Sequence, residues 1–309
     1  MTLYPEPLKP GDTIGIIAPG SPPDLERLDN GINYLESRGY KTRPGKSLRE
    51  MHGYLAGSDE KRAADVNEMF ENPDIKAIFC ARGGYGTPRI LSLIDYDVIK
   101  RNPKILVGYS DITALQLAVY KETMLVSFSG PMVAVEMGIG IDPFTEAHFW
   151  SMVTQTNATK KLTNQNNALE ILKPGQKKGR LLGGNLAMIC ALIGTPYLPD
   201  FKGAILVVED IAEEPYKIDR MFMQLKLAGI LNELNGLVLG QFIECKPTNE
   251  KPSFSVVEIV QQLTSESDYP ILSGLPFGHG AVKYTLPLGI EALIDGENGC
   301  LDIIGDFSA

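Results

Sequence analysis

Short apolar runs alternate with helical patterns through the first half of the chain. The runs predict strands at 13–17, 75–80, 104–108 and 124–130, and helical periodicity fills 25–39, 58–72, 87–102 and 111–122. Strands joined by a helix of about a dozen residues pair in parallel, because only a crossover returns the chain in the same direction. The pattern therefore predicts a doubly wound α/β domain, in which ligands gather at the carboxyl ends of the strands.

The second half of the chain has a different pattern. Residues 151–178 are polar, rich in Asn, Thr and Lys, and poorly periodic, so we interpret them as an interdomain connection. Strands dominate after it, including a terminal pair at 291–304. A chain of 309 residues also exceeds the usual size of a single core. We expect an N-terminal α/β domain at 1–150 and a smaller, β-rich C-terminal domain at 179–309.

Charge and composition exclude several classes of partner. The formal net charge is -9, so the surface repels nucleic acid and anionic lipid. No basic segment precedes an apolar run at the N-terminus, and no apolar stretch approaches the roughly 20 residues of a membrane helix. The prediction is a cytoplasmic protein with no nucleic-acid or membrane partner. Because HExxH, CxxC, GxGxxG and GxxxxGK[ST] are all missing, we expect no metal and no cofactor.

Ser110 follows the apolar run 104–108 and precedes a helical pattern. This is the setting of a nucleophile elbow, in which a sharp turn lifts a hydroxyl out of the sheet and the helix N-terminus behind it offers N–H groups to an oxyanion. The match to GxSxG is incomplete, because Ile112 replaces the second glycine. Taken alone, these residues are more typical of a serine or aspartate that caps the helix.

Other polar positions at strand ends could complete such a site. In CARGGYG, Gly83 and Gly84 could supply further N–H groups, although an ordinary turn or a phosphate loop is also compatible. Glu209 ends an apolar strand, and His279 lies in the glycine-bordered loop GLPFGHG; each is also compatible with a solvated residue. A serine needs a base, and an imidazole needs an acceptor to fix its tautomer, so the three side chains have complementary chemistry.

The sequence resembles the LD-carboxypeptidase family of serine peptidases, which includes murein tetrapeptide LD-carboxypeptidases and microcin C self-immunity peptidases. The shared segments run through nearly the whole chain in the same order: LKPGDTIGIIAPGSP, YLAGSDEKRAADVNEMF, ARGGYG, GYSDITAL, GRLLGGNLAMICALIGTPYLP, VEDIAEEPYKIDRM and GLPFGHG. The resemblance implies a Ser110–His279–Glu209 triad, with the oxyanion held by the backbone N–H groups of Gly84 and Asp111. It also implies a flavodoxin-like N-terminal domain and a homodimer.

The activity implied is release of the terminal D-alanine of a murein tetrapeptide. A carboxypeptidase must bind a free carboxylate, for which Arg82, beside the substrate-contacting Gly83, is a candidate and Arg220 a second. For either arginine an ion pair is the alternative, since Asp219 adjoins Arg220. Two other functions stay open: an immunity peptidase that cleaves aminoacyl-nucleotides, with Trp150 in a platform for the base, and a non-catalytic Rossmann-like binding protein.

Overall fold

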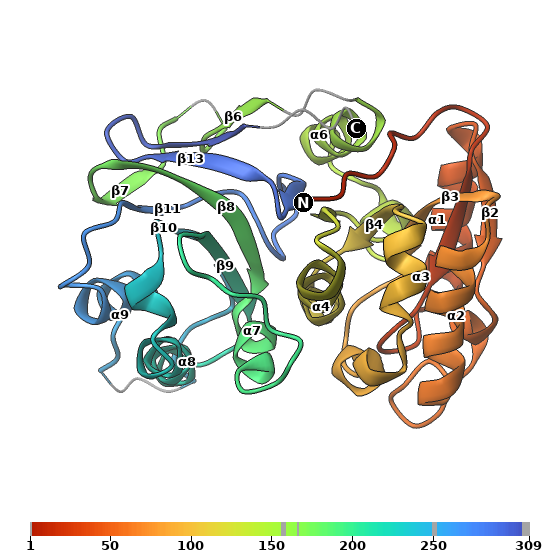
Figure 1. Ribbon diagram of the computed structural model, residues 1–309, viewed down its shortest axis with the longest axis horizontal. Helices are drawn as coiled ribbons and strands as arrows, with labels where there is room; N and C mark the ends of the chain where they lie inside the picture. Colours follow the sequence, from red (N-terminus) through yellow and green to blue (C-terminus); the bar gives the residue numbers. More distant parts are fainter. Residues whose placement is uncertain (1, 156–158, 166, 249–251, 305–309) are drawn as a thin grey trace. The chain divides into compact units, whose positions relative to one another are not determined.

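The computed structural model describes residues 2–155, 159–165, 167–248 and 252–304, which form two compact units (Figure 1). The first unit comprises residues 2–155 together with Tyr284–Gly289. The second comprises the described residues of Thr159–Lys283 and 290–304.

A six-stranded sheet in the order β12-β5-β4-β3-β1-β2 forms the centre of the first unit. Its strands are β1 (Thr13–Ile17), β2 (Lys41–Pro44), β3 (Ile75–Cys80), β4 (Ile105–Gly108), β5 (Ser127–Ser129) and β12 (Leu286–Leu288). The first five are parallel and β12 runs antiparallel to β5. Their order, 2-1-3-4-5, is the flavodoxin-like one, so the prediction of a doubly wound domain is confirmed.

Helices cover both faces of this sheet. Right-handed crossovers place α1 on one face and α2, α3 and α4 on the other, while α5 and α6 contact α1. The helices are α1 (Leu25–Ser37), α2 (Asp59–Glu71), α3 (Tyr96–Arg101), α4 (Thr113–Thr123), α5 (Glu136–Ile139) and α6 (Pro143–Thr154), with 3₁₀ turns η1 (Lys46–Arg49), η2 (Thr87–Leu93) and η3 (Ser110–Ile112). Polar caps fix where they begin: Asp24 accepts from the N–H of Arg27, and Ser58 from that of Lys61.

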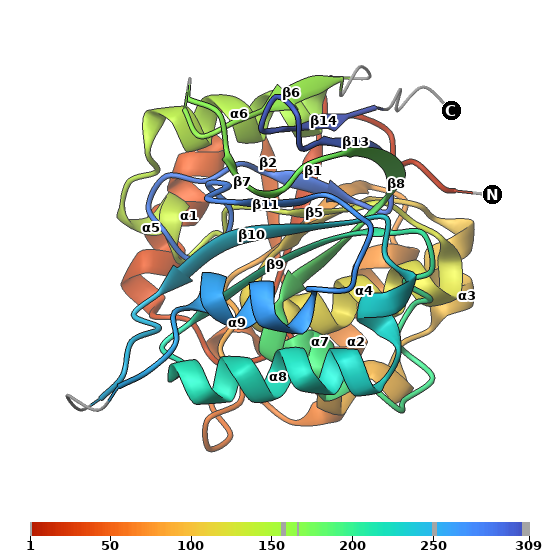
Figure 2. The same cartoon turned by 90° about the vertical axis from the view of Figure 1, so that its left-hand side faces the viewer.

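The second unit contains an eight-stranded mixed sheet in the order β6-β14-β13-β8-β9-β10-β11-β7. The strands are β6 (Lys160–Leu162), β7 (Glu170–Lys173), β8 (Gln176–Asn185), β9 (Ile205–Ile211), β10 (Gly236–Ile243), β11 (Ile271–Ser273), β13 (Glu291–Asp295) and β14 (Cys300–Ile303). Strands β8 to β11 are parallel. Helices α7 (Leu186–Leu192), α8 (Pro215–Leu227) and α9 (Val256–Leu263) lie on one side of β8, β9 and β10 (Figure 2), and η4 (Ile230–Glu233) follows α8. The expected β-rich second domain is present.

The domain boundaries differ from those predicted. Much of the expected connection at 151–178 is regular: it contains the end of α6, strands β6 and β7, and the start of β8, while 156–158 and 166 lie outside the described residues. Outer strands such as β6 and β7 are half exposed and carry polar side chains, so they lack the apolar alternation that reveals a strand. Residues Tyr284–Gly289 were assigned to the C-terminal domain but belong to the first unit, because β12 pairs with β5.

No helix in the described part of the chain is long and apolar enough to cross a membrane.

Candidate active site

Ser110 lies on a strained turn at the carboxyl end of β4. All residues of β4 are buried, and Ser110 itself has φ of 65°, in the left-handed region that a serine rarely occupies. The tight turn needs Gly108, because a Cβ there would lie 2.8 Å from Cγ2 of Ile112. Non-glycine residues held in this region persist where the surrounding structure imposes it, and they concentrate at functional sites.

The glycine turn after β3 lies against Ser110. A Cβ on Gly83 would lie 3.0 Å from Cβ of Ser110 and 3.2 Å from the backbone nitrogen of Asp111, so only a glycine fits there without displacement. Gly84 has φ of 96°, and the N–H of Ser21 donates to the carbonyl of Gly83 at 3.2 Å. The structure therefore brings together Ser110, Gly83 and the N–H of Asp111, as predicted from their positions at adjacent strand ends.

Asp111 also anchors the glycine turn through its side chain. Its buried Oδ2 accepts from the backbone N–H of Thr87 at 2.9 Å and from its hydroxyl at 2.6 Å. Burial raises the pKa of the Asp111 carboxyl, and the hydrogen bonds from Thr87 oppose this shift. Sequence reasoning considered Asp111 as a helix cap and as a backbone N–H donor, and it missed this contact with Thr87.

Arg62, on α2, holds the same turn from its other side. Its side chain is 1% exposed; Nη1 donates to the carbonyl of Gly86 at 3.0 Å and to that of Pro19 in the turn after β1. The guanidinium also pairs with Asp59, which accepts from Arg89 at 2.8 Å. One buried cation thus joins the two turns that flank the topological switch point of the sheet.

Glu209 and His279 meet in the second unit. Oε2 of Glu209 lies 2.6 Å from Nδ1 of His279; the carboxylate is 1% exposed and the imidazole 13%. Gly278, with φ of 127°, permits this approach, since a Cβ there would lie 2.7 Å from Oε2 of Glu209. An imidazole that a buried carboxylate orients through Nδ1 uses Nε2 to exchange protons, which is the arrangement of a general base.

Two amides that sequence reasoning missed hold this pair. Nδ2 of Asn185 donates to Glu209 at 3.3 Å and to Asp210 at 3.0 Å. Burial raises the pKa of Asp210 to about 6. Gln241 accepts from the N–H of Gly280 at 2.9 Å and donates to the carbonyl of Val282 at 3.0 Å, which fixes the loop that carries the imidazole.

The sequence does contain a signal for the contact between Asn185 and Glu209, but it can be recognised only when the register of the two strands is known. Asn185, the last residue of β8, is paired with Glu209 of the parallel strand β9, which continues to Ile211. Polar residues at paired positions in GGN and VED could have indicated this contact. Gln241 lies in the apolar segment GLVLGQF, and Arg62 in an ordinary polar helix; neither shows a comparable signal.

The two candidate carboxylate-binding arginines have different surroundings. Arg82 is half-buried beside Gly83; its guanidinium makes one long hydrogen bond, 3.5 Å, to the carbonyl of Pro22, and it joins no ion pair among the described residues. Arg220 is exposed on α8 with its guanidinium 6.0 Å from the ring centre of Tyr216. The expected alternative, an ion pair to Asp219, is not observed.

Trp150, considered as part of a base-binding platform, is engaged in packing. Its ring stacks on that of Tyr40 at 5.1 Å between centres, and its Nε1 donates to the hydroxyl of Tyr34 at 2.8 Å. His148 in the same helix accepts from the N–H of Thr285 at 3.1 Å.

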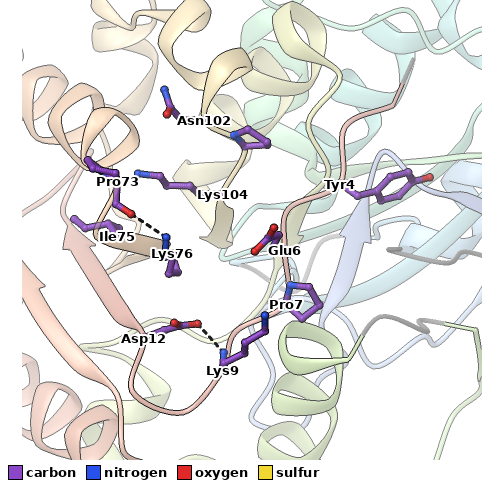
Figure 3. Close-up of a pocket in the computed structure, with 11 residues that line it drawn as sticks. Tyr4, Glu6, Pro7, Lys9, Asp12, Pro73, Ile75, Lys76, Asn102 and Lys104 are labelled. Atoms are coloured by element: carbon purple, nitrogen blue, oxygen red, sulfur yellow. Dashed lines mark hydrogen bonds between the residues drawn. The ribbon is translucent and has the colours of Figure 1, made fainter. Parts of the chain in front are cut away.

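A pocket of about 490 Å³ lies at the amino ends of the strands of the first sheet, away from the carboxyl ends where Ser110 lies (Figure 3). Asp12, Ile75 and Lys104, which stand at the amino ends of β1, β3 and β4, help to line it. Nζ of Lys104 donates to the carbonyls of Met69 and Asn72 at the end of α2. Because Ser110 stands at the carboxyl end of β4, this pocket is not part of the candidate active site.

Comparison with known proteins identifies the family. Residues 14–130 match the LD-carboxypeptidase N-terminal domain and residues 178–294 the LD-carboxypeptidase C-terminal domain. The probable murein peptide carboxypeptidase of Bacillus subtilis (strain 168) is 40% identical over 296 residues, 96% of this chain and 92% of that protein.

Two solved structures share the fold. The muramoyltetrapeptide carboxypeptidase from Oxalobacter formigenes superposes with a TM-score of 0.86 at 37% identity, covering 96% of this chain and 100% of that one. MccF in complex with glutamyl sulfamoyl guanosine superposes with a TM-score of 0.90 at 28% identity, covering 99% and 100%. With both family domains present, the resemblance in its sequence motifs is confirmed and the chain is an enzyme that belongs to the LD-carboxypeptidase family.

Proposed function

We propose that this enzyme is a serine carboxypeptidase that releases the terminal D-alanine of a murein tetrapeptide. The observation that carries the proposal is the buried Glu209–His279 pair at 2.6 Å in the second unit, and the serine hydroxyl on a strained turn beside a glycine turn in the first unit supports it. The names of the Bacillus and Oxalobacter relatives support a murein peptide as the substrate.

In the proposed mechanism, Oγ of Ser110 attacks the carbonyl carbon of the scissile bond and gives its proton to Nε2 of His279. Glu209 accepts from Nδ1–H and stabilises the imidazolium. Backbone N–H groups of Gly84 and Asp111 bind the oxyanion. His279 then protonates the leaving nitrogen, the C–N bond breaks and D-alanine departs. A water molecule, deprotonated by the same imidazole, hydrolyses the acyl-enzyme and restores the serine.

Arg82 is our preferred ligand for the substrate carboxylate. It stands beside the glycine turn and joins no ion pair among the described residues, so its fork of N–H donors is available for a bidentate contact. Arg220 is the second choice, because it lies exposed on α8.

The test is mass spectrometry of the products. We expect the wild-type protein to convert a disaccharide-tetrapeptide to a tripeptide that lacks D-alanine, and a serine-directed phosphonate to form an adduct at Ser110. Ser110→Ala should lower kcat by about 10⁴-fold to 10⁶-fold. A wild-type protein with neither product nor adduct would contradict the proposal.

A second candidate substrate follows from the MccF complex, in which the bound compound, glutamyl sulfamoyl guanosine, is an aminoacyl-nucleotide analogue. Aminoacyl-sulfamoyl adenosine incubated in parallel separates the two, because its cleavage without tripeptide formation would favour the immunity-type activity. The homodimer and the cytoplasmic location stay predictions; sedimentation velocity tests the first.

A further inference from the structure

Two exposed tyrosines adjoin the glycine turn of the first unit. Tyr54 is 63% exposed and Tyr85 50%, and their ring centres lie 5.4 Å apart with the planes inclined at 67°. Met51, 78% exposed, precedes Tyr54 in the same loop. Single exposed apolar residues are common, whereas adjoining aromatic rings beside a candidate active site indicate a binding surface. We call Tyr54 and Tyr85 the tyrosine pair.

The backbone beneath the tyrosine pair is firmly held, although the rings are exposed. His52 and Leu55 exchange backbone hydrogen bonds of 2.8 and 3.1 Å across the turn that carries Tyr54, and the N–H of Ala56 donates to the carbonyl of Gly20 at 3.0 Å. The N–H of Tyr85 donates to Oγ of Ser21 at 3.1 Å. Rings carried on a fixed backbone lose little freedom when they bind a ligand, so the surface is preorganised.

The tyrosine pair lies within reach of a substrate bound at Ser110. Tyr85 is two residues from Gly83, which contacts Ser110, and two residues span at most about 7 Å. In a murein tetrapeptide the scissile bond follows the third residue, so the saccharide joined to the first residue lies about 10 Å from the attacked carbon. The distances match without any movement of the chain.

The chemistry of this surface suits a sugar. Arg89 lies near both rings, but its guanidinium is paired with Asp59 at 2.8 Å, so this arginine is already neutralised by a carboxylate. The surface offers aromatic faces with hydroxyl groups at their rims. A pyranose ring has the complementary form, with an apolar face of C–H groups surrounded by hydroxyls, and amphipathic aromatic side chains bind such mixed surfaces.

We propose that the tyrosine pair binds the saccharide of the substrate and makes this enzyme prefer glycan-bearing murein peptides over free peptides. This inference rests on the proposed function, since it assigns a subsite of the same substrate. The glycan is the occupant we favour, because the surface continues directly from the glycine turn; a second copy of the chain is the alternative.

The experiment compares two substrates that differ only in the saccharide. We expect Tyr54→Ala to lower kcat/KM for the disaccharide-tetrapeptide about tenfold, chiefly through KM, and to leave the free tetrapeptide unaffected. Tyr54→Phe should retain most of the preference, because the ring face remains. Phe254→Ala removes an aromatic residue of similar exposure, 54%, from the second unit and should change neither substrate.

Equal losses on the two substrates, or no loss on either, would overturn the inference while the proposed function stands. A change of sedimentation coefficient in Tyr54→Ala would overturn it in favour of contact between two copies. If the wild-type protein cleaves neither substrate, the proposed function fails. The inference can then be tested separately by calorimetry, which measures the affinity of both compounds for Ser110→Ala and for the double variant Ser110→Ala, Tyr54→Ala. Equal affinities in those two proteins would then overturn it.

Discussion

Ser110 combines a chemically useful position with an unfavourable backbone conformation. A side chain in the left-handed region destabilises the folded state by about 1 to 2 kcal/mol relative to glycine. Glycine in turn has more conformational freedom in the unfolded chain, which destabilises the folded state by about 0.5 to 1 kcal/mol. We therefore expect Ser110→Gly to unfold with a free energy about 0.5 to 1 kcal/mol higher than Ser110→Ala, while both lose activity. Urea titration of the two variants measures the difference.

Ser110→Ala is the matched control, because it removes the hydroxyl and keeps the strain. Equal stability of the two variants would mean that the turn is not strained in solution.

Gly278 tests the contact that orients the imidazole. Gly278→Ala places a methyl group within 3.0 Å of the Glu209 carboxylate, so the pair must move apart. Because a displacement of about 1 Å costs up to about 100-fold, we expect kcat to fall tenfold to 100-fold with little change in KM. Gly229→Ala is the control: its φ is also positive, 80°, but nothing lies within 4 Å of the new methyl group. It should lose stability and keep kcat.

At the scale of elements, the buried parallel strands could be predicted from their apolar runs, and with them the position of Ser110 after β4. Glu209 was expected at the end of its strand, but β9 continues to Ile211. The half-exposed outer strands β6 and β7 could not be predicted, because strands in contact with water need no apolar alternation. The contacts of Arg62 and Gln241 could not be predicted from the sequence either. Their partners are backbone carbonyl and N–H groups of distant turns, and a polar residue in a sequence pattern does not reveal such partners.

Arg62 connects α2 to the turn after β1 and to the glycine turn. Its loss should therefore affect the candidate active site indirectly, by loosening the glycine turn. Arg62→Met leaves the carbonyls of Pro19 and Gly86 without this donor, and we expect the free energy of unfolding to fall by about 2 to 4 kcal/mol. Because the glycine turn loosens, kcat should fall about tenfold while KM changes less.

Val66→Ala is the matched control on the same helix, because Val66 is fully buried and its side chain has no polar group that could hold either turn. It should lower stability by about 2 kcal/mol and leave kcat unchanged. A loss of kcat in proportion to stability in both variants would show that Arg62 acts through general folding alone.

At the scale of the whole molecule, the chain passes from the first unit to the second, returns for Tyr284–Gly289 and leaves again. A single cut in the sequence cannot describe this path. The returning strand β12 is three residues long, and its pairing with β5 is a long-range contact that periodicity does not encode. The candidate residues are divided in the same way, since Ser110 belongs to the first unit and both Glu209 and His279 to the second.

This division yields a test that the proposed triad acts as one group. A phosphonate reacts with Ser110 only when a base removes the hydroxyl proton, so substitutions in the second unit should suppress modification of a serine in the first. We expect His279→Ala to slow adduct formation at least about 10³-fold and Glu209→Gln about 10²-fold to 10⁴-fold. Glu291→Gln, an exposed carboxylate in β13, should react at the wild-type rate. Unchanged modification of Ser110 in His279→Ala would show that another group serves as its base.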